Sequence, residues 1–230
     1  MRRALFPVLA LLAAAALAGC NQVYSEKPLF TSADEVGAPP LRPGVWTQPS
    51  AKCRFDERRP VQRWPKCGQW MLIRPGQILG FEEKEGKAAW TALDLVVASG
   101  DPRIIQLPAE EASPGRFAFA GARPVRLDPE GRIIAIETWP VQCGPPRKPV
   151  PAAPPSAADA PAASAQPSSA GGQSKPTAQS HVSEHPLPGL EVDGDNCIAR
   201  EASVVRTAAA SSKAWSESPT SYRWVRDTLP

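Results

Sequence analysis

Histidine is nearly absent from this chain of 230 residues, which contains only His181 and His185. Both lie in a proline-rich stretch, so hydrolase sites of the Ser-His-Asp or Cys-His kind have no base in the parts that we expect to fold. The Gly-x-Gly-x-x-Gly and P-loop motifs, the usual signs of nucleotide binding, are also missing. We therefore expect no catalytic residues and no cofactor, and the protein is predicted not to be an enzyme.

Acid–base catalysis by paired carboxylates is the enzymatic alternative that the sequence leaves open. Asp94 is of interest because it lies inside an apolar strand beside Trp90. No pattern selects a partner for it. The other carboxylates considered lie mostly in predicted turns, where solvation is their ordinary state: Glu82, Glu83, Glu110 and Glu111.

Long apolar runs and an excess of charge are also lacking. A membrane-spanning helix needs ~20 apolar residues, whereas the run at the amino end extends only from Ala4 to about Ala16. The 26 basic residues face 23 acidic ones, and the formal charge falls from +3 to +1 when Arg2 and Arg3 are left out. Because the numbers of basic and acidic residues are nearly equal, the charge does not favour nucleic acid as a partner.

The apolar run has a basic start and ends at Leu17-Ala18-Gly19-Cys20, as a secretory signal does. This pattern resembles the lipobox of bacterial lipoproteins. The resemblance implies diacylglycerol on the Cys20 sulfur, cleavage before Cys20 and acylation of the new amino group. In that class Asp after the cysteine often signals inner-membrane retention, and here the residue is Asn21. We therefore expect a lipid anchor in the outer membrane, with the protein facing the periplasm.

Four cysteines remain after Cys20, an even count that indicates disulfides in an exported chain. Four cysteines allow three pairings. We favour Cys53–Cys67, which closes a short loop, together with Cys143–Cys197. Zinc ligation is the alternative, but there is no Cys-x-x-Cys pair and we predict no metal site.

Two short motifs are similar to metal-binding patterns. His181-Val182-Ser183-Glu184-His185 matches the His-x-x-Glu-His of inverted zincin metalloproteases, but Pro186 disfavours the helix that this chemistry needs. Loose metal binding by the histidine pair is the alternative to simple solvation. Asp193-Gly194-Asp195-Asn196 resembles the start of an EF-hand loop, but Val204 stands where the bidentate glutamate is required.

Composition divides the chain into five segments. In the segment over 144–188, Pro, Ala and Ser supply 28 of the 45 residues. This segment therefore cannot bury enough apolar surface to become ordered. The segments are a signal peptide over 1–19, an extended membrane tether over 20–43, a β domain over 44–143, a disordered insertion over 144–188, and a helix plus strand over 189–230 that complete the β domain. The alternative for the tether is a first strand packed on the domain, with Leu29-Phe30 docked on it.

Short apolar runs separated by turn residues predict strands throughout 44–143. Pro75-Gly76 and Asp128-Pro129-Glu130-Gly131 each separate two apolar runs, which predicts two hairpins. Runs over 116–120 and 125–127 are read as separate strands. The fold class is therefore mainly β: an antiparallel meander forming a curled sheet or small barrel, with one C-terminal helix packed on it.

The last forty residues are too few for a core of their own. Asp193-Gly194-Asp195-Asn196 predicts a turn and the N-cap of a helix, after which Ile198, Ala202 and Val205 fall at helical spacing. Residues 222–225 predict a final strand. This segment should fold back onto the β domain, held there by Cys143–Cys197.

Tryptophan is plentiful, with seven residues against two tyrosines, and core packing is the preferred interpretation of most of them. Gly44-Val45-Trp46, before the predicted sheet, resembles the Gly-x-Trp of lipocalin-type barrels, in which these residues close one end. The function we favour is a non-enzymatic envelope adaptor that binds a protein partner through exposed aromatics. The alternative is a lipocalin-like carrier or inhibitor that binds a small apolar ligand.

Overall fold

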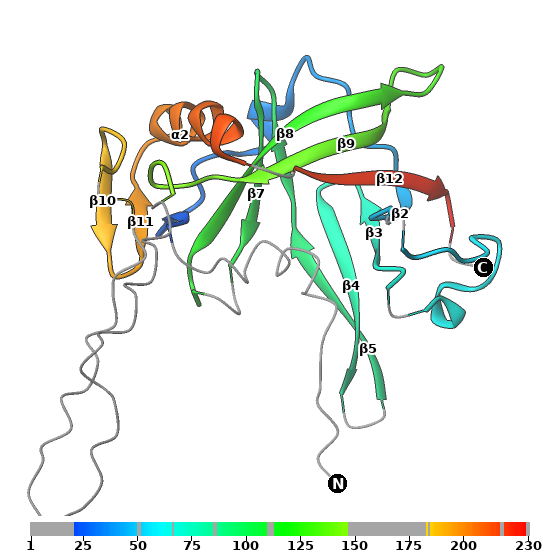
Figure 1. The fold of residues 1–230 in the computed structure, drawn as a ribbon. Helices are drawn as coiled ribbons and strands as arrows, with labels where there is room; N and C mark the ends of the chain where they lie inside the picture. Colours follow the sequence, from blue (N-terminus) through cyan, green and yellow to red (C-terminus); the bar gives the residue numbers. More distant parts are fainter. Residues whose placement is uncertain are drawn as a thin grey trace, which may run out of the picture.

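The computed structural model describes residues 21–49, 52–65, 67–84, 87–109, 113–146, 183, 185–216 and 219–228. In this part of the chain twelve strands form one mixed sheet, with a single α-helix packed on it (Figure 1). The predicted fold class is thereby confirmed. The elements are β1 (Val23–Ser25), η1 (Ser32–Glu35), β2 (Gly44–Thr47), η2 (Val61–Arg63), β3 (Trp70–Arg74), β4 (Gln77–Lys84), β5 (Lys87–Asp94), β6 (Val96–Ala98), β7 (Arg103–Pro108), β8 (Phe117–Leu127), β9 (Ile133–Pro140), β10 (Leu190–Asp193), β11 (Asn196–Ala199), α2 (Ala202–Trp215) and β12 (Thr220–Arg226).

The sheet is curled and does not close into a barrel. Its strand order is β10-β11-β1-β8-β9-β12-β2-β3-β4-β5, and β7 joins β8 while also pairing with β6. Strand β5 pairs with β4, and β6 pairs with β7. Leu95 is the single residue between β5 and β6. The chain therefore passes from one side of the curl to the other at Leu95. The pairing of β1 with β11 is parallel, which departs from a pure antiparallel meander.

Both predicted hairpins are confirmed. Gly76, with φ +70°, turns the chain between β3 and β4, and Gly131, with φ +78°, does so between β8 and β9. These conformations are open to glycine because it has no Cβ.

The two strands predicted over 116–120 and 125–127 are one continuous strand, β8, of eleven residues. Ala120 to Pro124 pairs without interruption along β9, and the register shifts beyond it, between Pro124 and Arg126 and again between Arg126 and Leu127. Proline cannot donate to a ladder but is tolerated at such an irregularity. The sequence break at Pro124 thus marks a bulge and not a turn.

The predicted tether over 20–43 is wrong for its described residues. The three residues of β1 lie at or below 3% exposure, and Phe30 is 1% exposed. The Gln106 side chain accepts the N–H of Leu29 at 2.8 Å and donates to the Phe30 carbonyl at 2.9 Å. This segment packs because partners far along the chain complete its hydrogen bonds, which local composition could not indicate.

The C-terminal segment folds back as predicted, but its helix begins later. Asp193–Asn196 turns β10 into β11 with Gly194 at φ +59°, and α2 starts only at Ala202 after Glu201 as N-cap. Cys197 and Ile198 pair with β1 and are therefore extended. The final strand, β12, is present and joins β9 to β2.

The predicted insertion over 144–188 is described only at its ends. Residues 144–146, 183 and 185–188 belong to the folded domain, and Ser183 is 5% exposed. The rest of the segment lies outside the described residues.

Apolar side chains form three main clusters. One fills the inside of the curl, where Trp46, Ile133 and Leu107 are buried. A second lies between α2 and the sheet, where Val205 and Ala209 pack on Phe119 and Ile104. A third covers the outside of β2 and β3 with the loop that carries Trp64. Within the described ranges, no helix is long and apolar enough to cross a membrane.

Candidate functional site

The sulfur positions agree with the predicted pairing. Cys53 is bonded to Cys67, fourteen residues away, and Cys143 is bonded to Cys197, fifty-four residues away. Cys143 and Cys197 are fully buried, so this bridge lies inside the domain. The predicted lipidation residue, Cys20, lies outside the described residues, and Asn21 is the first residue that the structure describes.

The residues considered for chemistry do not assemble in the described part of the chain. Asp94 is exposed on β5, and no group of three or more His, Cys, Asp or Glu side chains there could hold a metal ion. Of the His-x-x-Glu-His motif, His181 and Glu184 lie outside the described residues, and His185 is exposed. The side chains of Glu82, Glu83, Glu110 and Glu111 also lie outside them.

Most tryptophans pack in or against the apolar core, which agrees with the preferred interpretation. Trp46, Trp64 and Trp139 are at most 8% exposed, whereas Trp90 on β5 is 43% exposed. The Trp90 ring meets that of Trp70 edge-on, with 5.8 Å between the ring centres. The structure therefore places one tryptophan, Trp90, where a partner could reach it readily.

The most distinctive site is an apolar cavity of about 90 Å³ on the inside of the curl. Strands on both sides of the curl supply its walls, and none of the lining residues carries a charge. A water molecule needs about 10–15 Å³ and two to four polar partners, so a space of this size with this lining favours apolar occupants. The lining includes Leu41, Trp46, Met71, Ile73, Thr91, Leu93, Leu95, Leu107, Ala120, Ile136, Thr138 and Tyr222.

Alternation along single strands explains how the chain builds this lining. Thr91, Leu93 and Leu95 alternate along the chain and so share one face, and all three border the cavity. The sequence does not indicate that β8, β9 and β12 contribute to the cavity, because each of these strands adds only one or two residues to the wall. Alternation in those strands was the available signal, but it does not say which strands face each other.

The cavity's one phenol stays neutral. Tyr222 is 8% exposed, and burial raises its pKa to about 12. Its hydroxyl is therefore protonated at physiological pH. Together with Thr91 and Thr138, it gives the lining a few uncharged polar groups that could orient a ligand.

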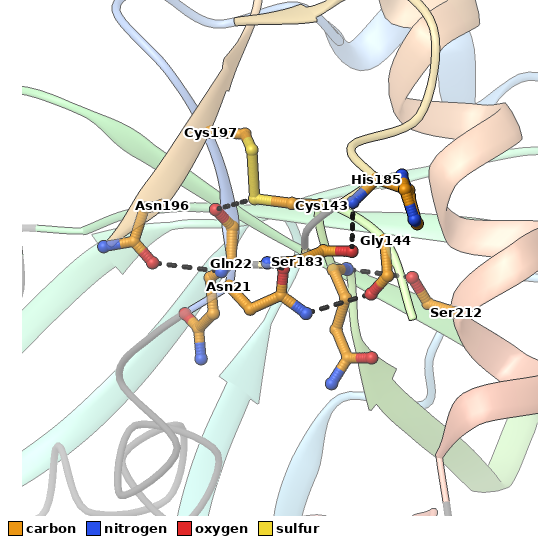
Figure 2. Close-up of a disulfide and its surroundings, with 10 residues drawn as sticks. Asn21, Gln22, Cys143, Gly144, Ser183, His185, Asn196, Cys197 and Ser212 are labelled. Carbon is orange, nitrogen blue, oxygen red and sulfur yellow. Dashed lines mark hydrogen bonds between the residues drawn. A yellow bond between two sulfur atoms is a disulfide. The ribbon is translucent and has the colours of Figure 1, made fainter. Parts of the chain in front are cut away.

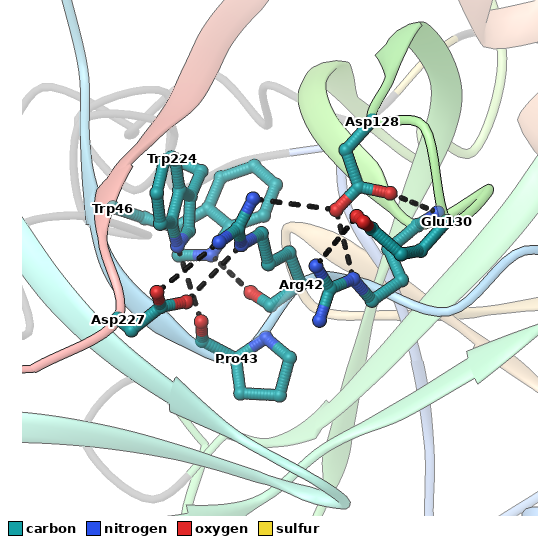
Figure 3. A network of polar contacts seen from close by, with 8 residues as sticks. Arg42, Pro43, Trp46, Asp128, Glu130, Trp224 and Asp227 are labelled. Atoms are coloured by element: carbon teal, nitrogen blue, oxygen red, sulfur yellow. Dashed lines mark hydrogen bonds and ion pairs between the residues drawn. The ribbon is translucent and has the colours of Figure 1, made fainter.

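A polar network includes Trp46, which also borders the cavity (Figure 3). The Trp46 indole N–H donates to the Arg42 carbonyl at 2.9 Å, and the Arg42 guanidinium lies 3.8 Å from the centre of the Trp224 ring. The same guanidinium pairs with Asp227 at 3.1 Å and with Asp128 at 3.4 Å. Arg42 thus links the start of β2 to the end of β12 and to the β8–β9 turn.

Gly44 has a steric role in this network. Its φ is +129°, and a Cβ there would meet the Arg226 carbonyl and would lie 2.8 Å from the Trp224 indole nitrogen. Only glycine permits this approach. Gly44 and Trp46 therefore join β2 closely to the end of β12, in a sheet that is not a closed barrel.

Asp128 is the buried charge of the network, with its side chain 2% exposed. Burial alone would raise its pKa, but hydrogen bonds from Arg132 and the charges of Arg132 and Arg42 hold that pKa below its usual value. Arg132 donates to it from both its backbone N–H and its Nε, each at 2.8 Å. The ionised carboxylate is therefore the form that fits this turn.

The chain was compared with protein-family models, with curated proteins and with solved structures, and nothing matches it in any of the three. The site must therefore be interpreted from its own geometry.

Proposed function

We propose that this protein is a non-enzymatic lipoprotein of the cell envelope, anchored to the outer membrane through Cys20, that holds a small apolar ligand. The uncharged cavity inside the curled sheet is the observation that supports binding of a small apolar ligand. A ligand with a charge inside this cavity would lose its hydration without a counter-charge, so a neutral apolar segment fits best. A slender group, such as the end of an acyl chain, suits the small volume.

Charge pairing supports a non-enzymatic role. Asp128, Asp193, Glu57 and Glu137 each form an ion pair with an arginine, as they would in a structural scaffold. None of these carboxylates borders the cavity.

A fluorescent fatty-acid analogue tests ligand binding. It would be titrated into the Cys20→Ala chain, which carries no anchor of its own that could occupy the site. Ala120→Leu adds volume inside the cavity and should weaken binding at least tenfold. Ala135→Leu is the matched control, because Ala135 precedes the cavity residue Ile136 in β9 and faces the other way.

Two results would contradict the carrier role: probe binding that does not saturate, or equal loss of binding in both leucine variants. Circular dichroism of both variants checks that overpacking has not unfolded them. Native mass spectrometry of the same chain, purified without reductant, would show a retained ligand as an added mass.

An adaptor role through protein binding is the second candidate. Its support is Trp90, which is 43% exposed on β5, the strand at one end of the sheet order. An exposed edge can accept an extended peptide as a further strand. A photo-crosslinking amino acid in place of Trp90 should give one discrete adduct in cells. The same amino acid at exposed Val125, on β8 inside the sheet order, is the control, and equal labelling at both sites would contradict this role.

A further inference from the structure

The amino end of the described chain is built into the domain. β1 lies between β11 on one side and β8 on the other, and Tyr24 pairs with both strands. The backbone of Gln22 is held as well: its N–H donates to Asn196 Oδ1 at 3.0 Å, and its carbonyl accepts the Cys197 N–H at 2.9 Å.

Three segments of the chain hold Asn21 by hydrogen bonds, and this group of contacts is the Asn21 clasp (Figure 2). The backbone N–H of Asn21 donates to the Asp195 carbonyl, and its side-chain amide donates to the Gly144 carbonyl at 2.9 Å. Its side-chain oxygen accepts the Ser183 N–H at 3.0 Å. The residue is 5% exposed and has φ +71°, a conformation that asparagine adopts more readily than most residues.

The clasp fixes the point at which the amino terminus leaves the fold. It joins the β10–β11 turn, Gly144 after β9 and Ser183, and the Cys143–Cys197 disulfide lies beside it (Figure 2). Cys20 directly precedes Asn21 in the sequence, and consecutive Cα atoms lie about 3.8 Å apart across a trans peptide bond. No spacer therefore separates the lipidated residue from the folded domain.

We propose that this end of the domain is a bilayer-contacting surface that rests directly on phospholipid headgroups. The surface consists of the β10–β11 turn (Asp193–Asn196), Gly144, Ser183 and residues 185–188. The proposal rests on lipidation of Cys20 as part of the proposed function. Two or three acyl chains hold an anchor firmly in the bilayer. Because the clasp fixes Asn21 in the domain, no flexible linker is present that would let the domain move away from the bilayer.

The chemistry of this surface fits the headgroup layer and not the hydrocarbon. His185 and the two aspartates of the turn are exposed, and they are polar or charged. Such groups remain hydrated at the level of the headgroups. The apolar cavity belongs to the other half of the curl, so the anchor and the cavity occupy separate parts of the domain.

Hydrogen–deuterium exchange of the full lipidated chain in phosphatidylcholine vesicles tests this orientation. These vesicles carry no net charge, so the acidic turn is neither attracted nor repelled as a whole. Amides of residues 190–197 should exchange at least fivefold more slowly than in the Cys20→Ala chain mixed with the same vesicles. A variant with twelve Gly/Ser residues inserted between Cys20 and Asn21 should float with the vesicles but lose this protection, since such a linker spans roughly 20 Å.

The same twelve residues inserted at Gly76, in the β3–β4 turn, provide the control and should leave the protection intact. The proposal is overturned if the lipidated chain floats with the vesicles while residues 190–197 exchange as fast as in the Cys20→Ala chain. It is also overturned if the Cys20–Asn21 spacer leaves the protection unchanged. Failure of the lipidated chain to float would instead contradict the lipid anchor itself, and with it this orientation.

Discussion

At the scale of single residues, Asn21 links three parts of the chain that are far apart in sequence. Replacing it with Ala removes the acceptor for the buried Ser183 N–H and the donor for the Gly144 carbonyl. We expect Asn21→Ala to lower the free energy of unfolding by about 1–3 kcal/mol, measured by urea denaturation of the Cys20→Ala chain.

Two controls separate the causes of that loss. Asn21→Gly also removes both hydrogen bonds but accepts positive φ without strain, so it should retain most of the loss. Lys27→Ala, at an exposed position nearby, should leave stability unchanged. A wild-type value for Asn21→Gly would show that backbone strain, and not the clasp, explains the alanine result.

Asp128 gives the fold a pH dependence of definite sign. Because its pKa is lowered in the folded protein, its contribution to stability is present at neutral pH and is lost as the pH falls through that pKa. The stability difference between wild type and Asp128→Asn should therefore be largest near neutral pH and shrink below about pH 4. Urea denaturation across this range measures it.

Glu130→Gln is the matched control for this pH series. Glu130 lies in the same turn and also pairs with Arg132, but its side chain is 63% exposed. Its substitution should change stability little at any pH. A constant difference between wild type and Asp128→Asn from neutral to acid pH would contradict the role assigned to the ionised Asp128.

At the scale of elements, the two disulfides restrain loops of different length. In the chain-entropy model, losing Cys143–Cys197 costs about 4 kcal/mol and losing Cys53–Cys67 costs about 3 kcal/mol. The longer bridge also attaches the C-terminal segment to β9 and β1. We therefore expect the Cys143→Ala/Cys197→Ala variant to unfold at a lower urea concentration than the Cys53→Ala/Cys67→Ala variant. The reverse order would show that Cys143–Cys197 does not carry this attachment.

Hairpins and strand faces could be predicted from sequence because their causes are local. Pro75-Gly76 sets a turn by its own dihedral preferences, and Thr91, Leu93 and Leu95 share a face by alternation alone. The start of α2 could not be predicted in this way. Ile198 fits a helical spacing, but its partner in β1 is Tyr24, and that pairing keeps it extended.

At the scale of the whole molecule, one covalent anchor should decide where the protein is found. Cys20→Ala removes the proposed site of lipid attachment, and we expect it to move the protein from the membrane fraction to the soluble fraction. The Cys53→Ala/Cys67→Ala variant is the control, since it loses cysteines but keeps the anchor. Continued extraction of Cys20→Ala by detergent alone would contradict the lipoprotein proposal.

The sequence by itself determined the mainly β fold, the two hairpins and the return of the C-terminal segment. These follow from neighbouring residues and from a segment too short for a core of its own. For the cysteines it allowed three pairings and favoured one, and the folded positions of the sulfur atoms decided between them.

The tertiary structure alone decided the packing of residues 21–43, the clasp at Asn21 and the apolar cavity. The partners of Asn21 and β1 lie about one hundred residues or more along the chain, and the cavity wall takes a few residues from each of many strands. Such features arise only when distant segments meet, because no single stretch of the chain contains the contacts that stabilise them.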